Sequence, residues 1–262
     1  MSIEKILGMP ELASAHGYEI DFMIFIVHVF MLILFVGWGV FFFYCLFKFN
    51  HWANPKADYH GVQSHRSTYL EAIVVVIEVI LLVGFSIPFW IKQVNNYPDR
   101  KDVVELRINA EQFAWNVHYP GLDGIFGKTD VQFFDKQSNP MGLDPNDPNG
   151  KDDFTAINQL HIPIGKPAII HLTSRDVVHS FFIPQMRARQ DTIPGMSIPV
   201  WFTPIKTGKY EIACAQLCGL GHYRMKGFVT VESQEDFDKW YASQSSAASA
   251  EASGGGGDDF WN

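Results

Sequence analysis

The apolar residues of this chain are concentrated in two long runs near its N-terminus. No charged residue occurs between Asp21 and Lys48, a span that exceeds the roughly 20 residues a helix needs to cross a bilayer. A second apolar run covers residues 72–91 and contains one acidic residue, Glu78. Soluble helices rarely continue so far without a charge, so the pattern predicts a hairpin of two transmembrane helices. The expected helices cover about 22–47 and 70–93.

The distribution of basic residues predicts how this hairpin is oriented. Basic residues near the ends of membrane helices mark the cytoplasmic side. The loop between the two runs carries Lys48, Lys56 and Arg66 against Asp58, whereas the N-terminal tail carries Lys5 against four acidic residues. We therefore expect the loop in the cytoplasm and both termini on the outer side. This arrangement predicts a multi-pass protein of a bacterial-type cytoplasmic membrane, with its C-terminal part in the periplasm.

From residue 98 onwards the pattern changes to short runs of β-branched and aromatic residues separated by Gly and Pro. Such spacing predicts an antiparallel β-sandwich or barrel. The expected strands are 103–108, 112–119, 167–173, 197–203, 208–213 and 227–231. A short helix is expected to start near Ser233, and the Ser-, Ala- and Gly-rich end predicts a flexible tail. The expected domains are 1–97, 98–242 and the tail 243–262.

An acidic insertion lies between Asp123 and Asp153, where seven aspartates and three lysines leave a net charge of −4. Residues 144–153 resemble a calcium-binding loop, but their prolines and the lack of a closing glutamate argue against calcium. The insertion is either a solvated loop or a surface that attracts a basic partner. The whole chain has a formal charge of −8, and we expect no nucleic-acid partner.

The densest group of metal-binding residue types lies near the end of the β-rich part. Cys214, Cys218, His222 and Met225 supply two thiols, an imidazole and a thioether, and His179 supplies a second imidazole upstream. Soft sulfur ligands combined with histidine favour copper. Five side-chain ligands are more than one small copper centre takes, but two thiolates that each bridge two metals would use them all. The pattern therefore predicts a dinuclear, thiolate-bridged copper centre that carries electrons.

Three other kinds of site explain less of this group. A disulfide between Cys214 and Cys218 would leave His179, His222 and Met225 without a role. A structural zinc site takes four thiolate or imidazole ligands, and a thioether is a poor ligand for zinc. A mononuclear blue-copper site uses one cysteine, so it would leave the second thiol unused.

Three motifs make this chain similar to one known family. They are residues 176–181 (Asp-Val-Val-His-Ser-Phe), residues 190–195 (Gln-Asp-Thr-Ile-Pro-Gly) and the segment from Cys214 to Met225. Together with the two apolar runs, they resemble subunit II of the haem–copper cytochrome c oxidases over nearly the whole chain. The resemblance implies a membrane-anchored, otherwise all-β fold. In it, a two-helix transmembrane hairpin precedes a cupredoxin-like Greek-key β-sandwich that holds a dinuclear copper centre called CuA.

The resemblance also implies a role for each candidate ligand. Cys214 and Cys218 would bridge the two coppers. The remaining ligands would be His179 and Met225 on one copper, and His222 and the main-chain carbonyl of Gln216 on the other.

The function implied by the resemblance is that of the subunit through which electrons enter the oxidase. A soluble or tethered cytochrome c would give electrons to the copper centre, from which they pass to the haem of subunit I. Oxygen reduction and the coupled proton pumping would occur in subunit I, so this chain alone is not expected to reduce oxygen. The expected partners are subunit I, other oxidase subunits, cytochrome c and the lipid bilayer.

A few positions depart from the family pattern or carry further roles in it. Gln216 stands where the family often has a glutamate that also binds magnesium at the border with subunit I, and an amide oxygen binds magnesium more weakly. Phe113 stands at the family's tryptophan for electron transfer, and Trp115 is nearby in sequence. Glu71 matches a glutamate at the mouth of a proton channel, or it is a solvated carboxylate near a helix start. Glu78, about two turns deeper, pairs with a neighbouring subunit or joins a proton path.

Other protein classes fit the sequence less well. A quinol oxidase subunit II needs neither the thiols nor Met225, and the copper domain of nitrous oxide reductase would require a large further domain. A copper carrier must release its metal, which a membrane hairpin and five ligands do not favour. Four histidines outside the motif are expected to have structural or surface roles. They are His28, His118, His161 and His171.

Overall fold

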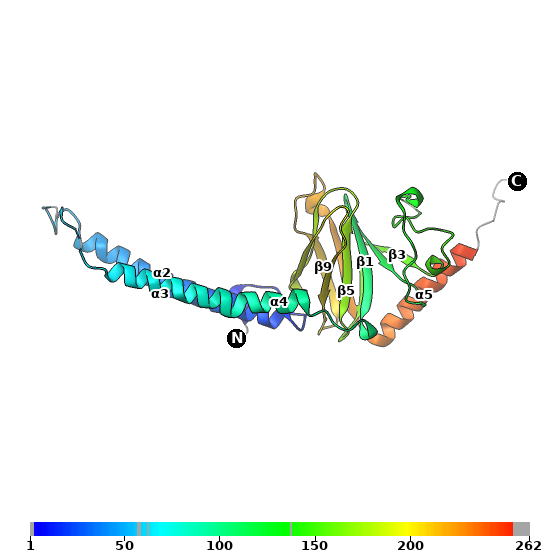
Figure 1. Cartoon of the computed structure of the whole chain (residues 1–262), viewed down its shortest axis with the longest axis horizontal. Coiled ribbons are helices and arrows are strands. Elements are labelled where there is room, and N and C mark those ends of the chain that lie inside the picture. The colour runs from blue at the N-terminus through cyan, green and yellow to red at the C-terminus, as the bar shows by residue number, and fades with distance from the viewer. Residues whose placement is uncertain (1–2, 57–58, 62, 137, 254–262) are drawn as a thin grey trace. The chain divides into compact units, whose positions relative to one another are not determined.

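The computed structural model describes residues 3–56, 59–61, 63–136 and 138–253 (Figure 1). The chain forms two compact units. The helical unit contains the residues up to 9 and residues 19–97, and the β unit contains residues 10–18 and the chain from 98 onwards. Residues 10–18 were expected in the first domain, which ends at residue 97, but they belong to the β unit.

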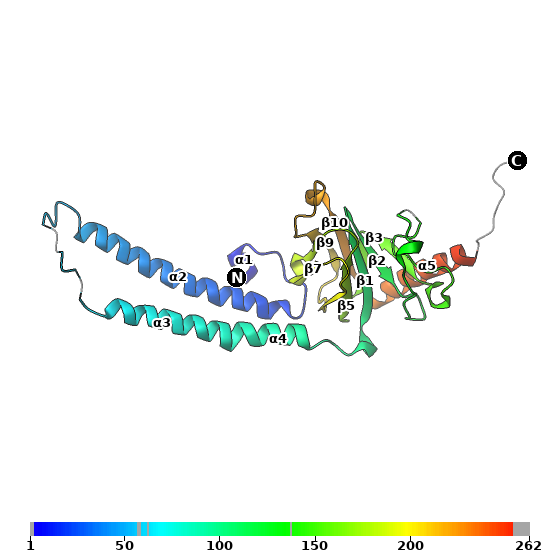
Figure 2. The same cartoon turned by 45° about the horizontal axis from the view of Figure 1, so that its top comes forward.

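The two apolar runs of the helical unit are helical, and Figure 2 shows them running beside each other. α1 (Ile3–Leu7) is short, and α2 (Gly17–Lys48) contains the first run. The second run forms α3 (Arg66–Leu81), a π-helical turn η1 (Leu82–Ser86) and α4 (Ile87–Asn95). Both runs are long and apolar enough to cross a membrane, as the sequence predicted.

The break between α3 and α4 has a local cause. Pro88 lies in the first turn of α4 and has no main-chain N–H to donate. The chain widens into the π-helical turn just before it, and the Ser86 hydroxyl donates to the carbonyl of Leu81 at 3.3 Å. Almost none of the residues in the two runs is buried within this chain. Such exposure is costly in water and favourable in lipid, so these helices are suited to anchor the protein in a membrane.

The β unit is a sandwich of two five-stranded sheets, with strand orders β3-β2-β1-β5-β8 and β4-β10-β9-β6-β7. The strands are β1 (Val104–Glu111), β2 (Ala114–Tyr119), β3 (Phe154–Ile157), β4 (Gln159–Pro163), β5 (Ala168–Ser174), β6 (His179–Ile183), β7 (Ala188–Thr192), β8 (Ile198–Phe202), β9 (Gly208–Cys214) and β10 (Lys226–Glu232). Short 3₁₀ turns are η2 (Arg100–Asp102), η3 (Val131–Phe133), η4 (Pro148–Gly150), η5 (Pro184–Met186) and η6 (His222–Arg224).

The sandwich differs from the predicted antiparallel arrangement in two places. β1 pairs with β5 in parallel, and β10 pairs with β4 in parallel. Alternation of apolar and polar residues reports which face of a strand is buried and carries no information on strand direction. The sequence pattern therefore predicted the strands but not these two parallel pairs.

The core lies between the two sheets. Leu106 and Ile108 of β1 and Ile212 of β9 are fully buried. Trp115 of β2 has no exposed surface, and its ring packs edge-on against Phe181 of β6 with ring centroids 5.6 Å apart. This packing holds β6 against the core, and β6 in turn pairs with β9.

Residues 10–18 complete the β unit as a short strap. The main-chain N–H of Ala13 donates to the carbonyl of Gln185 at 2.8 Å, and the N–H of Ile205 donates to the carbonyl of Ala13 at 2.8 Å. The Ser14 hydroxyl donates to the carbonyl of Met186 at 2.6 Å. Ala13 and Ser14 are both fully buried. The strap is therefore an integral part of this fold.

The C-terminal helix α5 (Gln234–Ser253) is longer than predicted, because it continues ten residues past the expected start of the tail at Ser243. Trp240 packs edge-on against Tyr119 of β2 with ring centroids 5.2 Å apart. The Ser245 hydroxyl donates to a main-chain carbonyl of the acidic insertion at 3.1 Å. Alanine-rich sequence favours helix, and these contacts hold the added turns in place. The predicted tail beyond residue 253 lies outside the described residues.

The acidic insertion between β2 and β3 uses its carboxylates to fix its own turns. Asp147 accepts the main-chain N–H of Lys128 at 2.8 Å, and Asp152 accepts that of Leu122 at 2.6 Å. Asp153 is buried rather than solvated. In the described part of the insertion, aspartates thus serve as hydrogen-bond acceptors that hold the turns.

Candidate metal centre

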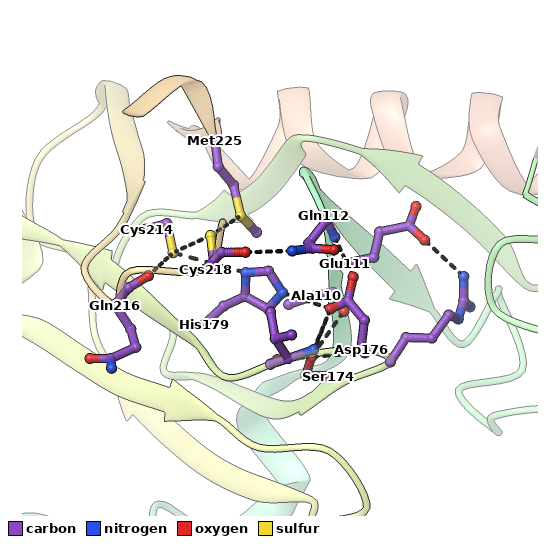
Figure 3. A network of polar contacts seen from close by, with 12 residues as sticks. Ala110, Glu111, Gln112, Ser174, Asp176, His179, Cys214, Gln216, Cys218 and Met225 are labelled. Carbon is purple, nitrogen blue, oxygen red and sulfur yellow. Dashed lines mark hydrogen bonds and ion pairs between the residues drawn. The ribbon is translucent and has the colours of Figure 1, made fainter. Parts of the chain in front are cut away.

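The five candidate side-chain ligands come from two segments of the β unit, which the fold brings together. Figure 3 shows four of them, His179, Cys214, Cys218 and Met225. His179 is the first residue of β6, and Cys214 is the last residue of β9. β6 and β9 are antiparallel neighbours with Phe181 opposite Cys214, so both ligands lie at the same end of one sheet. Cys218, His222 and Met225 follow in the connection between β9 and β10.

The ligand atoms converge on a small space. The sulfur atoms of Cys214 and Cys218 are 3.7 Å apart, and both thiols are free. Nδ1 of His179 lies 4.0 Å from the Cys214 sulfur, and Nδ1 of His222 lies 3.5 Å from the Cys218 sulfur. The Met225 sulfur lies 3.8 Å from that of Cys218. Each thiol therefore has one imidazole nitrogen beside it.

Three of the five ligand side chains are buried, and those of Cys214 and His222 are half-buried. His179 is fully buried, and Cys218 and Met225 are 4% and 2% exposed. The ring of Trp115 packs edge-on against His179 with centroids 6.2 Å apart. Burial beside the aromatic ring of Trp115 limits the access of water to these three ligands and restricts their movement.

His179 is oriented by a carboxylate three residues before it. Its Nε2 donates to Oδ1 of Asp176 at 2.9 Å, which leaves Nδ1 with its lone pair towards the sulfurs. Asp176 Oδ1 also accepts the main-chain N–H of Val177 at 2.7 Å. Burial would raise the pKa of Asp176, but these hydrogen bonds lower it below its ordinary value. The carboxylate is therefore ionised and stabilises this orientation of the imidazole.

The two thiols differ in how readily they ionise. Burial would raise the pKa of Cys214, but hydrogen bonds with His179 and nearby main-chain groups outweigh it and bring the pKa to about 6. Burial raises the pKa of Cys218 to about 12, and the adjacent Cys214 sulfur adds to the rise. One thiolate thus forms at neutral pH, and the second needs a positive charge beside it. A bound metal ion would supply that charge.

The donor set fits copper. Thiolate, thioether and imidazole are soft or borderline ligands, a combination that selects copper over magnesium or calcium. His179, Cys214 and Cys218 form the one group of His, Cys, Asp or Glu side chains close enough to hold a metal ion within the described part of the chain. The carbonyl oxygen of Gln216 lies 3.2 Å from the Cys214 sulfur and adds a main-chain oxygen to the set.

Comparison with known proteins shows which family the chain belongs to. The family profile described as cytochrome c oxidase subunit II, periplasmic domain, matches residues 104–233. The alternative cytochrome c oxidase subunit 2 of Bradyrhizobium diazoefficiens is 36% identical over 78% of this chain and 73% of its own length. The probable cytochrome c oxidase subunit 2 of Rickettsia bellii is 29% identical over 91% of this chain and 82% of its own.

The chain belongs to the cytochrome c oxidase subunit II family. The resemblance found in the sequence is thereby confirmed. The protein is a subunit of a haem–copper terminal oxidase, with two apolar helices followed by a β-sandwich of the cupredoxin-like kind. The crystal structure of the periplasmic domain of subunit II of a cytochrome oxidase from Bradyrhizobium japonicum is also similar. It is 25% identical and covers 57% of this chain and 97% of that chain, with a TM-score of 0.42.

The two aromatic residues that the sequence linked to electron transfer lie in different surroundings within this subunit II. Phe113 is half-buried and lies directly against the connection that holds the ligands: a Cβ at Gly221 would meet its ring at 2.4 Å. Arg224 lies over the same ring at 6.0 Å. Trp115 is fully buried in the core and does not reach the surface.

The residues for which a magnesium-binding or proton-path role was predicted have side chains outside the ligand group. The side chain of Gln216 is exposed and points away from the sulfurs (Figure 3). Glu71 and Glu78 lie on α3 in the helical unit, both exposed in this chain.

The four histidines for which structural or surface roles were expected all contact polar groups of the protein. His28 contacts the carbonyl of Ile24 one turn earlier at 2.7 Å. The other three each contact a carboxylate, in the pairs His118–Asp153, His161–Glu232 and His171–Glu105.

Sequence reasoning missed two residues of the site. Asp176 stood in a recognised motif, but it received no role there. Gln112 was not singled out, although it contacts both segments that carry ligands. Its contact with Cys218 spans 106 positions, and no local pattern reports a pairing at that distance.

Proposed function

We propose that this subunit II accepts electrons from cytochrome c at a dinuclear copper centre in its β unit. From there the electrons pass to the haem of subunit I, where oxygen reduction is coupled to proton pumping. One observation carries the proposal. Two free thiols, one half-buried and one buried, lie 3.7 Å apart, and each has the Nδ1 atom of a different histidine beside it.

The proposed ligand set uses every donor that the fold brings to this pocket. Cys214 and Cys218 would bridge the two metal positions. The other ligands would be His179 and Met225 at one position, and His222 and the carbonyl of Gln216 at the other. Shared thiolate ligands would let one added electron spread over both ions, so the positions of the ligands would change little on reduction.

The chain's own residues keep the site ready for electron transfer. Asp176 holds the His179 imidazole in one tautomer and one orientation. The core contacts of Trp115 and Phe181 keep the end of β6 in place and exclude water. A rigid site does not need to reorganise when its charge changes, and this lowers the barrier to electron transfer.

Phe113 is proposed as the residue nearest the donor, with Trp115 behind it in the core. The Phe113 ring packs against the glycines between Cys218 and His222, so a haem edge at this surface would lie close to two ligands. Phenylalanine provides a flat apolar contact without the indole N–H that a tryptophan would offer.

The remaining roles concern the membrane and the neighbouring subunits. We propose that both termini and the β unit lie on the periplasmic side, in agreement with the charge of the loop between the two helices. Glu71 and Glu78 are proposed to face a proton path or subunit I, because exposed carboxylates within an apolar span are costly in lipid. Magnesium at the border with subunit I would be held through Gln216.

The three cysteines offer a direct test of the proposed centre. The full chain is purified in detergent, loaded with copper and analysed for bound metal. We expect two coppers per chain, and loss of the dinuclear centre in Cys214→Ser and Cys218→Ser. Cys45→Ser is the matched control, because Cys45 lies in α2 and should leave the metal content unchanged. Equal copper content in all three variants would contradict the proposal.

A further inference from the structure

The ligands of the proposed centre come from two separate segments, and Gln112 bridges them. Gln112 lies in the turn between β1 and β2. Its main-chain N–H donates to Oδ2 of Asp176 at 2.7 Å. Its side-chain Nε2 donates to the carbonyl of Cys218 at 2.6 Å (Figure 3). One residue thus contacts the carboxylate beside His179 and the main chain of a thiol ligand.

The first of these contacts continues to a ligand. Asp176 accepts the Nε2–H of His179 at 2.9 Å. The three hydrogen bonds form an unbroken chain from His179 through Asp176 and Gln112 to Cys218. A change in the position of Gln112 would therefore alter the spacing between the imidazole on β6 and the thiol in the connection.

The connection between β9 and β10 lies so close to Gln112 and Phe113 that it leaves no room for a side chain at two of its glycines. Gly219 has a φ of +128°, and a Cβ there would lie 2.7 Å from Nε2 of Gln112 and 3.3 Å from the Phe113 ring. A Cβ at Gly221 would also collide with Phe113. Glycine is required at both positions because the main chain after Cys218 lies directly against Gln112 and Phe113.

We propose that Gln112 is a positioning residue of the copper centre. This inference rests on the function proposed above. The carboxamide of Gln112 fixes the main chain of Cys218 relative to His179. The side-chain Nε2–H of Gln112 also directs the positive end of its dipole towards Cys218, which is a ligand residue. A positive dipole end stabilises the state that carries one more electron, so the contact raises the reduction potential of the centre.

A merely structural role would have different consequences. Gln112 is an exposed residue, and water can replace the hydrogen bond that a substitution removes. The stability of the fold should therefore change little when the carboxamide is lost. The geometry and electronic structure of the centre should change, because water does not hold the Cys218 carbonyl in a fixed position.

The test compares Gln112→Met with Gln159→Met in the full chain, purified in detergent and loaded with copper. Methionine has a similar length and no donor, and Gln159 is an exposed residue of β4 that serves as the control. For Gln112→Met we expect about 10-fold weaker copper binding in competition with a chelator. We also expect an altered paramagnetic resonance spectrum and a lower midpoint potential. Gln159→Met should match the unmodified chain in all three measurements.

Two further variants make the outcome decisive. Gln112→Asn keeps the amide but is one methylene shorter, so it should change the spectrum and the potential in the same direction as Gln112→Met. Gln112→Met should add little to the loss of copper affinity caused by Asp176→Asn, because both act through one chain of hydrogen bonds. Unchanged affinity, spectrum and potential in both Gln112 variants would overturn the inference. Failure of the unmodified chain to bind two coppers would instead overturn the proposed function.

Discussion

The buried pair between His118 and Asp153 allows a prediction whose size follows from the structure. Both side chains are fully buried, and Nε2 of His118 lies 2.6 Å from Oδ2 of Asp153. The same oxygen accepts the main-chain N–H of Gly127 at 2.9 Å. Asp153→Ala would therefore remove the acceptor of two buried donors at once, one on β2 and one in the acidic insertion.

The expected cost is large. A buried donor left without a partner costs about 1–3 kcal/mol, and breaking a buried pair by removing one member costs about 3–5 kcal/mol. We expect Asp153→Ala to lower the free energy of unfolding of the β unit by about 3–5 kcal/mol. His118→Phe should cost a similar amount, because it leaves the Asp153 carboxylate buried without its partner.

The double variant tests whether the cost of each single change comes from leaving one buried polar group without its partner. His118→Phe with Asp153→Leu removes both polar groups and leaves only the N–H of Gly127 without an acceptor. Its expected cost is about 1–3 kcal/mol, less than that of either single change. Asp123→Ala is the control in the same insertion, because Asp123 is exposed and should cost less than about 1 kcal/mol.

The assay is chemical denaturation of the full chain in detergent, followed by near-ultraviolet circular dichroism of the aromatic core. The single variants should shift the midpoint strongly, and the double variant should recover part of the loss. The reasoning would be refuted if Asp153→Ala behaved like Asp123→Ala. It would also be refuted if the double variant were less stable than both single variants.

Further predictions concern the site, the strap and the surface near the ligands. Asp176→Asn should weaken copper binding by about 10- to 100-fold in a chelator competition, and unchanged affinity would contradict its role in orienting the imidazole. Ala13→Asp should destabilise the β unit by about 3–5 kcal/mol in the same denaturation assay, since Ala13 is fully buried. The exposed control Glu11→Gln should cost less than about 1 kcal/mol, and equal effects would argue against the strap. Gly221→Ala would place a Cβ 2.4 Å from the Phe113 ring and should slow reduction by cytochrome c in stopped-flow measurements, by as much as about 100-fold. An unchanged rate with two coppers bound would argue against electron transfer near Phe113.

The features that sequence reasoning predicted best are those that depend on residues close together in the sequence. The ligands from Cys214 to Met225 share one short segment, so their chemistry is visible without knowledge of the fold. The two apolar runs are equally local, because membrane insertion depends on the hydrophobicity of consecutive residues. The convergence of His179 on this segment followed from its motif and from the resemblance, and the pairing of β6 with β9 supplies the physical reason.

The features that escaped prediction depend on contacts between distant residues. Residues 10–18 join the β unit through main-chain hydrogen bonds, which leave no mark on side-chain patterns. Asp153 was counted with the other charges of the insertion, yet it is buried against His118 because the insertion folds onto β2. The contact of Gln112 with Cys218 is of the same kind, since either residue alone is unremarkable in the sequence.

The measurement that tests the central claim most directly is electron paramagnetic resonance of the copper-loaded full chain, together with a count of its bound copper. We predict two coppers per chain and the spectrum of one unpaired electron shared equally by two copper nuclei. A spectrum from an electron on a single copper, or a content of one copper or none, would contradict the account.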